Sequence, residues 1–179
     1  MKFCTQCASP VALRVPDGDT MARHVCEACG EIHYQNPKIV AGCIPEWEGK
    51  ILLCRRAIEP RNGLWTIPAG FMENGETVEQ AAARETWEEA CAHVEINGLY
   101  AVFNIPHVNQ VYMIFRAALK DETFAPGIES LETGLFEEAE IPWSQMAFPV
   151  VVQSLERYFS DRQRDHFPTF LGTLEPIKR

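Results

Sequence analysis

Three glutamates lie close together in a segment that the sequence predicts to be helical. Glu85, Glu88 and Glu89 occupy positions i, i+3 and i+4, which share one face of an α-helix. Their charges repel one another, and between residues 73 and 115 Arg84 is the only lysine or arginine against seven acidic residues. Hard divalent cations prefer oxygen ligands and also bind phosphates. The pattern therefore suits a Mg²⁺ or Mn²⁺ site that acts on a phosphorylated substrate, but for three glutamates alone a solvated acidic helix face is the more common explanation, and the surrounding motif decides between the two.

A second group of side chains has the spacing of a zinc site. Four of the seven cysteines form two identical Cys-x2-Cys pairs separated by 18 residues: Cys4, Cys7, Cys26 and Cys29. This spacing is typical of a zinc ribbon, in which four thiolates surround one Zn²⁺. His24 and His33 lie nearby, but four thiolates already complete a tetrahedral shell. A complete shell leaves no position for substrate, so we expect a structural zinc. Redox-active or chance cysteine pairs are the alternative.

Length, composition and charge describe one folded domain with a small attachment. The chain has 179 residues, of which 46% are hydrophobic and 23% charged, as in ordinary globular proteins. Its net charge of −9 disfavours a nucleic-acid partner. No segment approaches the roughly 18 to 20 apolar residues that span a bilayer, and the first ten residues lack the apolar core of a signal peptide. We expect a cytoplasmic protein without a membrane partner, and a homodimer is compatible with the sequence.

Apolar runs and turn residues predict the elements that must position these side chains. Residues 1–34 form the cysteine-containing ribbon, and residues 35–179 form a second domain with a sustained core pattern. Strands are expected at 38–45, 51–57, 99–104 and 111–119. One helix is expected at 77–92, opened by the capping box Thr77-x-x-Gln80, and a second from Pro149 through Phe159. Trp87 lies opposite the glutamates and is expected to pack inward, whereas the tail from Asp161 is expected to be irregular. The pattern indicates an α/β fold.

The segment from Gly70 to Ala92 resembles the Nudix box, G-x5-E-x7-R-E-U-x-E-E-x-G-U, where U is a bulky aliphatic residue. Six positions match in register: Gly70, Glu76, Arg84, Glu85, Glu88 and Glu89. Two positions depart, because Thr86 replaces a bulky aliphatic residue and Cys91 replaces a glycine. A side chain at Cys91 disfavours the positive φ that glycine permits. The resemblance implies the Nudix fold, an α/β/α sandwich with a mixed sheet, over about residues 37–160.

The resemblance to Nudix hydrolases also implies roles for particular residues. The implied ligands of the catalytic metals are Glu85, Glu88 and Glu89, with the carbonyl of Ala69 as a further ligand. Glu76 and Arg84 are the implied supporting pair.

Two later glutamates compete for an additional catalytic role. Glu129 lies seven residues before Phe136, where NADH pyrophosphatases place a metal-binding glutamate ahead of an aromatic strand end. Glu132 is the close competitor, and a charge on a surface loop is the alternative for both.

Four further residues are expected to contact the substrate. Trp65 and Phe103 offer aromatic surfaces on which a flat base can stack, although core packing is equally compatible with them. Arg55 and Arg56 adjoin the predicted strand pair, from which a guanidinium can reach a phosphate.

A more specific likeness extends over the whole chain. The zinc ribbon, Gly63-Leu-Trp-Thr-Ile-Pro-Ala-Gly70 and Phe124-Ala-Pro-Gly-Ile-Glu-Ser-Leu-Glu132 together resemble the plant-type FAD and ADP-ribose pyrophosphatases. This likeness implies a dinucleotide or nucleotide-sugar substrate, with FAD cut to FMN and AMP or ADP-ribose cut to AMP and ribose 5-phosphate. NADH pyrophosphatases share the ribbon, but their signature S-Q-P-W-P-F-P-x-S has no match in residues 103–110. NADH is therefore the second choice. A hydrolase of damaged nucleoside triphosphates or a non-catalytic zinc-ribbon adaptor are further alternatives, and the intact glutamates oppose the adaptor.

Overall fold

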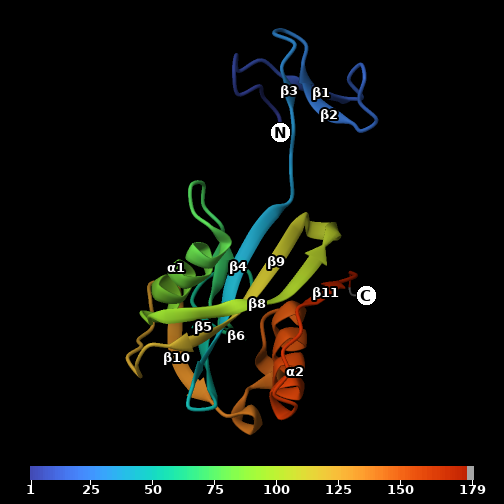
Figure 1. Cartoon of the computed structure of the whole chain (residues 1–179). Coiled ribbons are helices and arrows are strands. Elements are labelled where there is room, and N and C mark those ends of the chain that lie inside the picture. The colour runs from blue at the N-terminus through green and yellow to red at the C-terminus, as the bar shows by residue number, and fades with distance from the viewer. Residues whose placement is uncertain (177–179) are drawn as a thin grey trace. The chain divides into compact units, whose positions relative to one another are not determined.

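The computed structural model describes residues 1–176, and the chain divides into two compact units with a boundary between Pro37 and Lys38 (Figure 1). The first unit is a small antiparallel sheet of three strands, β1 (Val11–Arg14), β2 (Arg23–Cys26) and β3 (Ile32–His33). Its two Cys-x2-Cys pairs form similar turns. Cys4 O accepts from Ala8 N at 3.0 Å and Cys26 O accepts from Gly30 N at 2.9 Å. The sheet and these turns bring the two cysteine pairs together.

The second unit is built around one mixed sheet of eight strands. Its principal order is β10-β5-β4-β9-β8-β11, with β6 paired to β5 and β7 paired to β4. The strands are β4 (Lys38–Trp47), β5 (Lys50–Arg56), β6 (Trp65–Thr66), β7 (Ala69–Phe71), β8 (Val94–Ile105), β9 (Gln110–Leu119), β10 (Ser130–Phe136) and β11 (Phe170–Thr173). β4 runs parallel to β9 and β11 runs parallel to β8, whereas the other pairs are antiparallel. The strands expected at 38–45, 51–57, 99–104 and 111–119 lie within or overlap β4, β5, β8 and β9.

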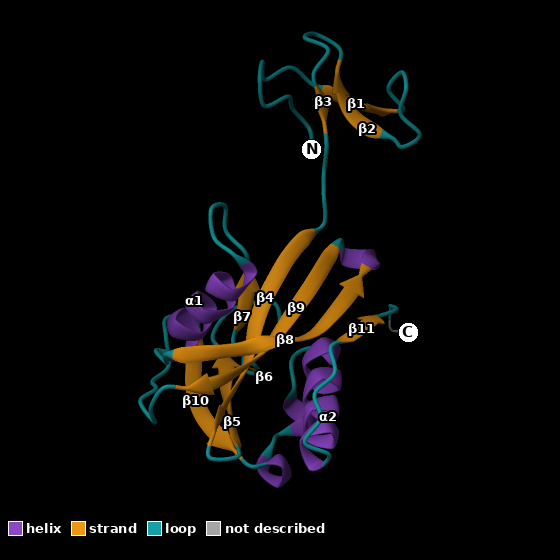
Figure 2. Ribbon diagram, viewed as in Figure 1, coloured by secondary structure: helices purple, strands orange, loops and turns teal. Residues whose placement is uncertain are grey.

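Two helices cover the two faces of this sheet (Figure 2). Alternation along the strands sends Ile44 and Leu53 into one apolar cluster, which contains Leu155 of α2 (Pro149–Gln163). The intervening positions, such as Leu52, enter a second cluster with Ala81 of α1 (Val78–Ala90). Three short 3₁₀ helices, Pro106–Val108, Glu138–Glu140 and Trp143–Gln145, lie in connections. The predicted α/β/α sandwich with a mixed sheet is confirmed. Within the described residues, no helix is long and apolar enough to span a bilayer.

The ends of α1 are defined by local interactions. Thr77 and Gln80 form the predicted capping box, in which each side chain accepts a hydrogen bond from the other residue's backbone amide. At the other end Cys91 adopts a left-handed conformation with φ 47°, and its amide donates to Trp87 O at 2.8 Å. The tight turn expected of a glycine is therefore formed by a residue that carries a side chain.

Several expectations about the second unit are wrong. α2 continues to Gln163, and the tail expected to be irregular contains β11. Asp161 is 1% exposed and accepts a hydrogen bond from Tyr100 Oη at 2.8 Å. Trp87 does not pack inward, because 48% of it is exposed and its ring stacks on His93 at 4.4 Å. The helix instead buries the face that carries two of its glutamates.

Candidate active site

The four paired cysteines converge in the first unit. Their Sγ atoms all lie within 4.8 Å of one another, and the Cys4–Cys29, Cys7–Cys26 and Cys7–Cys29 separations are 3.5–3.6 Å. Four sulfurs bound to one Zn²⁺ at about 2.3 Å are about 3.8 Å apart, so the arrangement fits the ion. His33 lies outside this group and places its Nε2 3.3 Å from Cys4 Sγ. The donor set is complete without a histidine ligand.

The glutamates of α1 face a short segment of β7. Glu89 Oε2 accepts a hydrogen bond from Ala69 N at 3.3 Å. Gly70 follows, and a Cβ atom at this position would overlap the carboxylate of Glu85. The absence of a side chain at Gly70 therefore allows Glu85 to approach the β7 backbone. β7 is in turn held by β4, where Gly42 pairs with Ala69.

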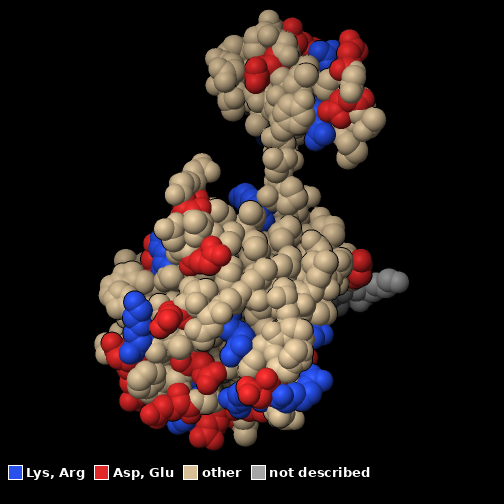
Figure 3. Space-filling model, in the orientation of Figure 1, with Lys and Arg blue, Asp and Glu red and all other residues tan. Residues whose placement is uncertain are grey.

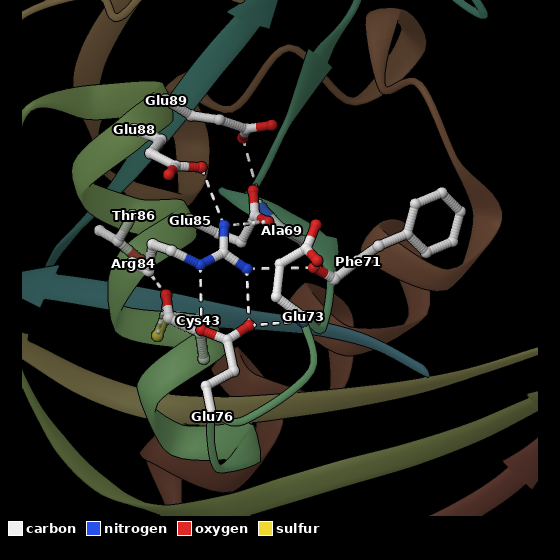
Figure 4. Close-up of polar contacts among 11 residues, drawn as sticks. Cys43, Ala69, Phe71, Glu73, Glu76, Arg84, Glu85, Thr86, Glu88 and Glu89 are labelled. Atoms are coloured by element: carbon white, nitrogen blue, oxygen red, sulfur yellow. Dashed lines mark hydrogen bonds and ion pairs between the residues drawn. The ribbon is translucent and has the colours of Figure 1, made fainter. Parts of the chain in front are cut away.

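Arg84 connects most of the remaining acidic groups (Figure 4). Its Nη1 donates to Glu85 at 2.8 Å and to Glu88 at 2.9 Å, and its Nε and Nη2 donate to Glu76 at 3.0 and 2.8 Å. Nη2 also donates to Phe71 O at 3.0 Å. The guanidinium lowers the pKa of Glu76 to about 2. Glu76 therefore stays ionised and keeps Arg84 beside the other two carboxylates.

Glu85 and Glu89 are buried acidic groups with incomplete charge compensation. They are 9% and 7% exposed. Burial raises the pKa of Glu89 to about 8, and the charges of Glu85 and Glu129 add to the effect. Burial also raises the pKa of Glu85 despite its contact with Arg84. A divalent cation would supply the missing positive charge, so this oxygen-rich donor set fits Mg²⁺ or Mn²⁺.

The carboxylates of α1 do not converge as closely as the cysteines do. Among the residues that the structure describes, the four cysteines are the only group of three or more metal-ligating side chains within 4.8 Å. Arg84 holds Glu85 and Glu88 beside Glu76, whereas Glu89 turns toward Ala69. Glu88 has a side chain that is 54% exposed and has room to rotate.

The structure places the two later glutamates in different surroundings. Glu129 precedes β10, and its charge raises the pKa values of Glu85 and Glu89. Its carbonyl oxygen accepts from Ala57 N at 2.8 Å. Glu132 lies within β10 and pairs with Arg55 at 3.5 Å, with both side chains about half exposed. The charge of Glu129 therefore acts on the buried glutamates of α1, whereas Glu132 forms an ion pair with Arg55.

The expected substrate-binding residues also differ in their surroundings. Arg56 stacks on the ring of Phe148 at 5.2 Å, and its charge lowers the pKa of Glu89. Trp65 and Phe103 are 7% and 1% exposed and lie in the core. Their rings pack against other aromatic rings, with centroid separations of 5.0 Å for Trp65–Phe136 and 5.4 Å for Phe103–Phe170. Neither ring presents a free face for a base in this structure.

Two features of the second unit were missed by reasoning from sequence. One is a cavity of about 470 Å³ at the start of α2, lined by Arg61, Met146, Ala147, Phe148, Pro149, Val152, Gln153 and Glu156. Arg56 stacks on Phe148 in this lining, and its charge lowers the pKa of Glu89. The other is the contact of Gly127 with the backbone of α1. The only sequence signal for the contact is the Pro126-Gly127 turn. The cavity has no such signal, because its lining residues, which lie between Met146 and Glu156 apart from Arg61, form no recognisable motif.

Comparisons with protein families and solved structures agree with this geometry. The family model described as "Nudix N-terminal", a zinc ribbon, matches residues 2–35, and the NUDIX domain model matches residues 36–163. A crystal structure of a NUDIX hydrolase from Nitrosomonas europaea is 58% identical, with a TM-score of 0.95. The match covers 98% of this chain and 100% of that one.

Two curated relatives carry names that state an activity. The NAD-capped RNA hydrolase NudC of Chromobacterium violaceum is 32% identical over 92% of this chain and 60% of its own length. The ADP-ribose pyrophosphatase of Methanocaldococcus jannaschii is 38% identical over 41% of this chain and 43% of its own length. The chain thus spans less than two thirds of either relative.

Proposed function

Because the chain belongs to the Nudix family, we propose that it hydrolyses the diphosphate bond of a nucleoside diphosphate joined to a second group. The buried pair Glu85 and Glu89 carries this proposal. Both are carboxylates whose pKa values are raised by burial when no cation is present. Such a pair binds a divalent cation favourably, because the cation removes the repulsion and part of the cost of burying two charges.

We assign the metal-binding role to Glu85, Glu88, Glu89 and the Ala69 carbonyl. Bound Mg²⁺ or Mn²⁺ neutralises the diphosphate and makes a bound water more acidic. The Ala69 amide holds the Glu89 carboxylate, and Arg84 holds Glu85 and Glu88. Arg56 provides positive charge beside Glu89 for a phosphate oxygen.

Glu129 is the proposed general base. Its charge raises the pKa values of Glu85 and Glu89, which supports a position beside the diphosphate that these residues would hold through the cation. It accepts a proton from the attacking water as the water oxygen bonds to phosphorus. The bridging phosphorus–oxygen bond then breaks, and its electron pair leaves with the departing phosphate.

The proposed substrate is FAD or ADP-ribose. The cavity at the start of α2 lies beside Arg56 and offers Phe148 and Arg61 to the group beyond the diphosphate. The similarity to an ADP-ribose pyrophosphatase supports this choice. NADH is the second candidate, because a relative that matches 92% of this chain is named for hydrolysis of NAD-capped RNA.

Acidic and basic side chains are interspersed on the face of the second unit shown in Figure 3. Together with the net charge of −9, this distribution favours a small molecule over RNA. A cytoplasmic location, and the absence of nucleic-acid and membrane partners, stay predictions.

The test is a comparison of kcat/KM in one Mg²⁺ buffer for FAD, ADP-ribose, NADH, a nucleoside triphosphate and a short NAD-capped RNA. We expect FAD or ADP-ribose to have the highest value. NADH leading both by tenfold or more would replace this assignment with an NADH pyrophosphatase, and a preference for the capped RNA would overturn the small-molecule assignment. Glu89→Gln, prepared in parallel, shows whether the turnover belongs to this protein.

A further inference from the structure

The loop before β10 is attached to the end of α1 by backbone hydrogen bonds. Ala125 N donates to Ala90 O at 2.9 Å, and Gly127 N donates to Glu89 O at 3.0 Å. These acceptors belong to the last turn of α1, whose carbonyl groups have no partner within the helix. The loop therefore supplies two donors that complete the helix, and it is fixed to the residues that carry the carboxylates.

Gly127 makes the closest approach in this contact. A Cβ atom at position 127 would overlap the carbonyl oxygen of Glu88, and would lie 2.8 Å from the Glu88 carbonyl carbon and 3.2 Å from that of Glu89. All three are backbone atoms of a helix packed on the sheet, so they cannot rotate away. The backbone of Gly127 is not in the left-handed region. The glycine is thus required by space and not by its backbone angles.

This contact is two residues from Glu129. Ser130 N donates to Gly127 O at 3.1 Å, which closes a tight turn around Glu129, and Ala57 N holds the Glu129 carbonyl at 2.8 Å. The Glu129 backbone is therefore fixed on one side by Ala57, which follows β5, and on the other by the Gly127 turn. Ile128 lies between them, is 97% exposed and contributes no packing.

We propose that Gly127 is a positioning residue, whose contact with the Glu88–Glu89 backbone sets the distance from the Glu129 carboxylate to Glu85 and Glu89. This inference rests on the proposed function. It adds that the absence of a side chain at Gly127, which lies outside the segment that resembles the Nudix box, determines how well the general base Glu129 is aligned. A methyl group at position 127 must push the loop away from α1, and a displacement of about 1 Å at a reacting group lowers the rate by up to about a hundredfold.

A double-mutant cycle tests the proposal with the full-length, zinc-loaded protein. Gly127→Ala is expected to lower kcat by between about tenfold and a hundredfold, with KM changed by less than about threefold. In a Glu129→Gln background the same substitution is expected to lower kcat by less than about threefold, because the group that it positions is already absent. Ile128→Ala is the matched control in the same loop and should retain wild-type kcat.

Each outcome of the cycle bears on the proposal. An equal loss of kcat in both backgrounds, or a normal kcat in Gly127→Ala, would overturn it. If Gly127→Ala does not fold, one glycine inserted between Gly127 and Ile128 replaces it, because the insertion displaces Glu129 without adding a Cβ atom. If Glu89→Gln loses activity while Glu129→Gln and Gly127→Ala retain it, this inference fails and the proposed function stands. If Glu89→Gln also retains activity, the proposed function itself fails.

Discussion

Replacing Glu89 by glutamine should inactivate the protein and stabilise it in the absence of divalent cations. Glu89→Gln keeps the size of the side chain and an oxygen that can accept from Ala69 N. It removes the charge that a bound cation would require. We expect kcat to fall by at least about a hundredfold, which corresponds to about 2.7 kcal/mol of transition-state stabilisation.

The expected gain in stability follows from the pKa of Glu89. Burial raises it from 4.5 to about 8, so the folded protein holds this proton at pH 7. Protonating a group with an unfolded-state pKa of 4.5 at pH 7 costs the folded state about 3 kcal/mol. Water that enters the site reduces this cost. We therefore expect Glu89→Gln to be more stable by about 1 to 3 kcal/mol, or by between about 2 and 12 °C in Tm for a chain of this size.

The gain in stability of Glu89→Gln over the wild type should increase with pH. The wild type should have its full stability below the unfolded-state pKa of 4.5 and lose stability as the pH rises through about 8, because the raised pKa of Glu89 opposes ionisation. The variant lacks this loss, so the difference between the two proteins grows from near zero at pH 4.5. Mg²⁺ should reverse the order, since it stabilises the wild type more than the variant.

Urea unfolding at several pH values, with and without Mg²⁺, measures these differences. The Mg²⁺-free buffer is prepared with a chelating resin before the protein is added, and zinc content is checked so that the first unit keeps its ion. Glu95→Gln, an exposed change of the same type on β8, is the control. If Glu89→Gln is no more stable than the wild type at pH 8 without Mg²⁺, the burial argument is wrong. Near-normal turnover would show that the cation is held elsewhere.

Two further substitutions test other parts of the structure. Cys26→Ser should lose zinc and lower Tm while the second unit keeps some Mg²⁺-dependent turnover, because the four thiolates leave no position for substrate at the zinc. Zinc analysis of the variant measures the loss. Almost no zinc in freshly purified wild type would contradict the assignment of a zinc site. Cys91→Gly should raise the free energy of unfolding by about 1 kcal/mol, because Cys91 has φ 47° and glycine adopts that conformation without strain. An unchanged or lower midpoint in urea would show that the Cys91 side chain contributes more than its backbone strain costs.

Local signals predicted the parts of the fold that depend on neighbouring residues. The capping box at Thr77 and Gln80 marked the start of α1, because both hydrogen bonds lie within four residues. Continuous apolar runs marked β4 and β5, which are buried on both faces. By contrast, β11 pairs with residues about 70 positions earlier in β8, and its four residues, Phe170–Thr173, have no pattern of their own. Such pairing depends on a surface that exists only after the rest of the sheet has formed.

The candidate site was predictable in its residue types but not in its burial. Helical spacing placed Glu85 and Glu89 on one face, and the usual assumption that acidic faces are solvated then placed Trp87 inside. The structure reverses this arrangement, because the buried face of α1 contains these two glutamates and Trp87 is half-exposed. Sequence spacing also could not separate Glu129 from Glu132. The surroundings of the two glutamates differ because β10 begins between them, and the pairing of β10 with β5 places Glu132 beside Arg55.

The position of β11 has a consequence for self-association. β8 is twelve residues long, and within residues 1–176 the strand that pairs with its side away from β9 is β11, which meets Ala101–Asn104. Removing the chain after Asp165 would extend the unpaired edge over Ala101–Asn104 and leave further amide and carbonyl groups unsatisfied, which can pair with the same edge of another molecule. We therefore expect the short strand β11 to limit edge-to-edge pairing between molecules. Its loss should appear as concentration-dependent aggregation even where the carboxylates and the zinc ribbon are intact.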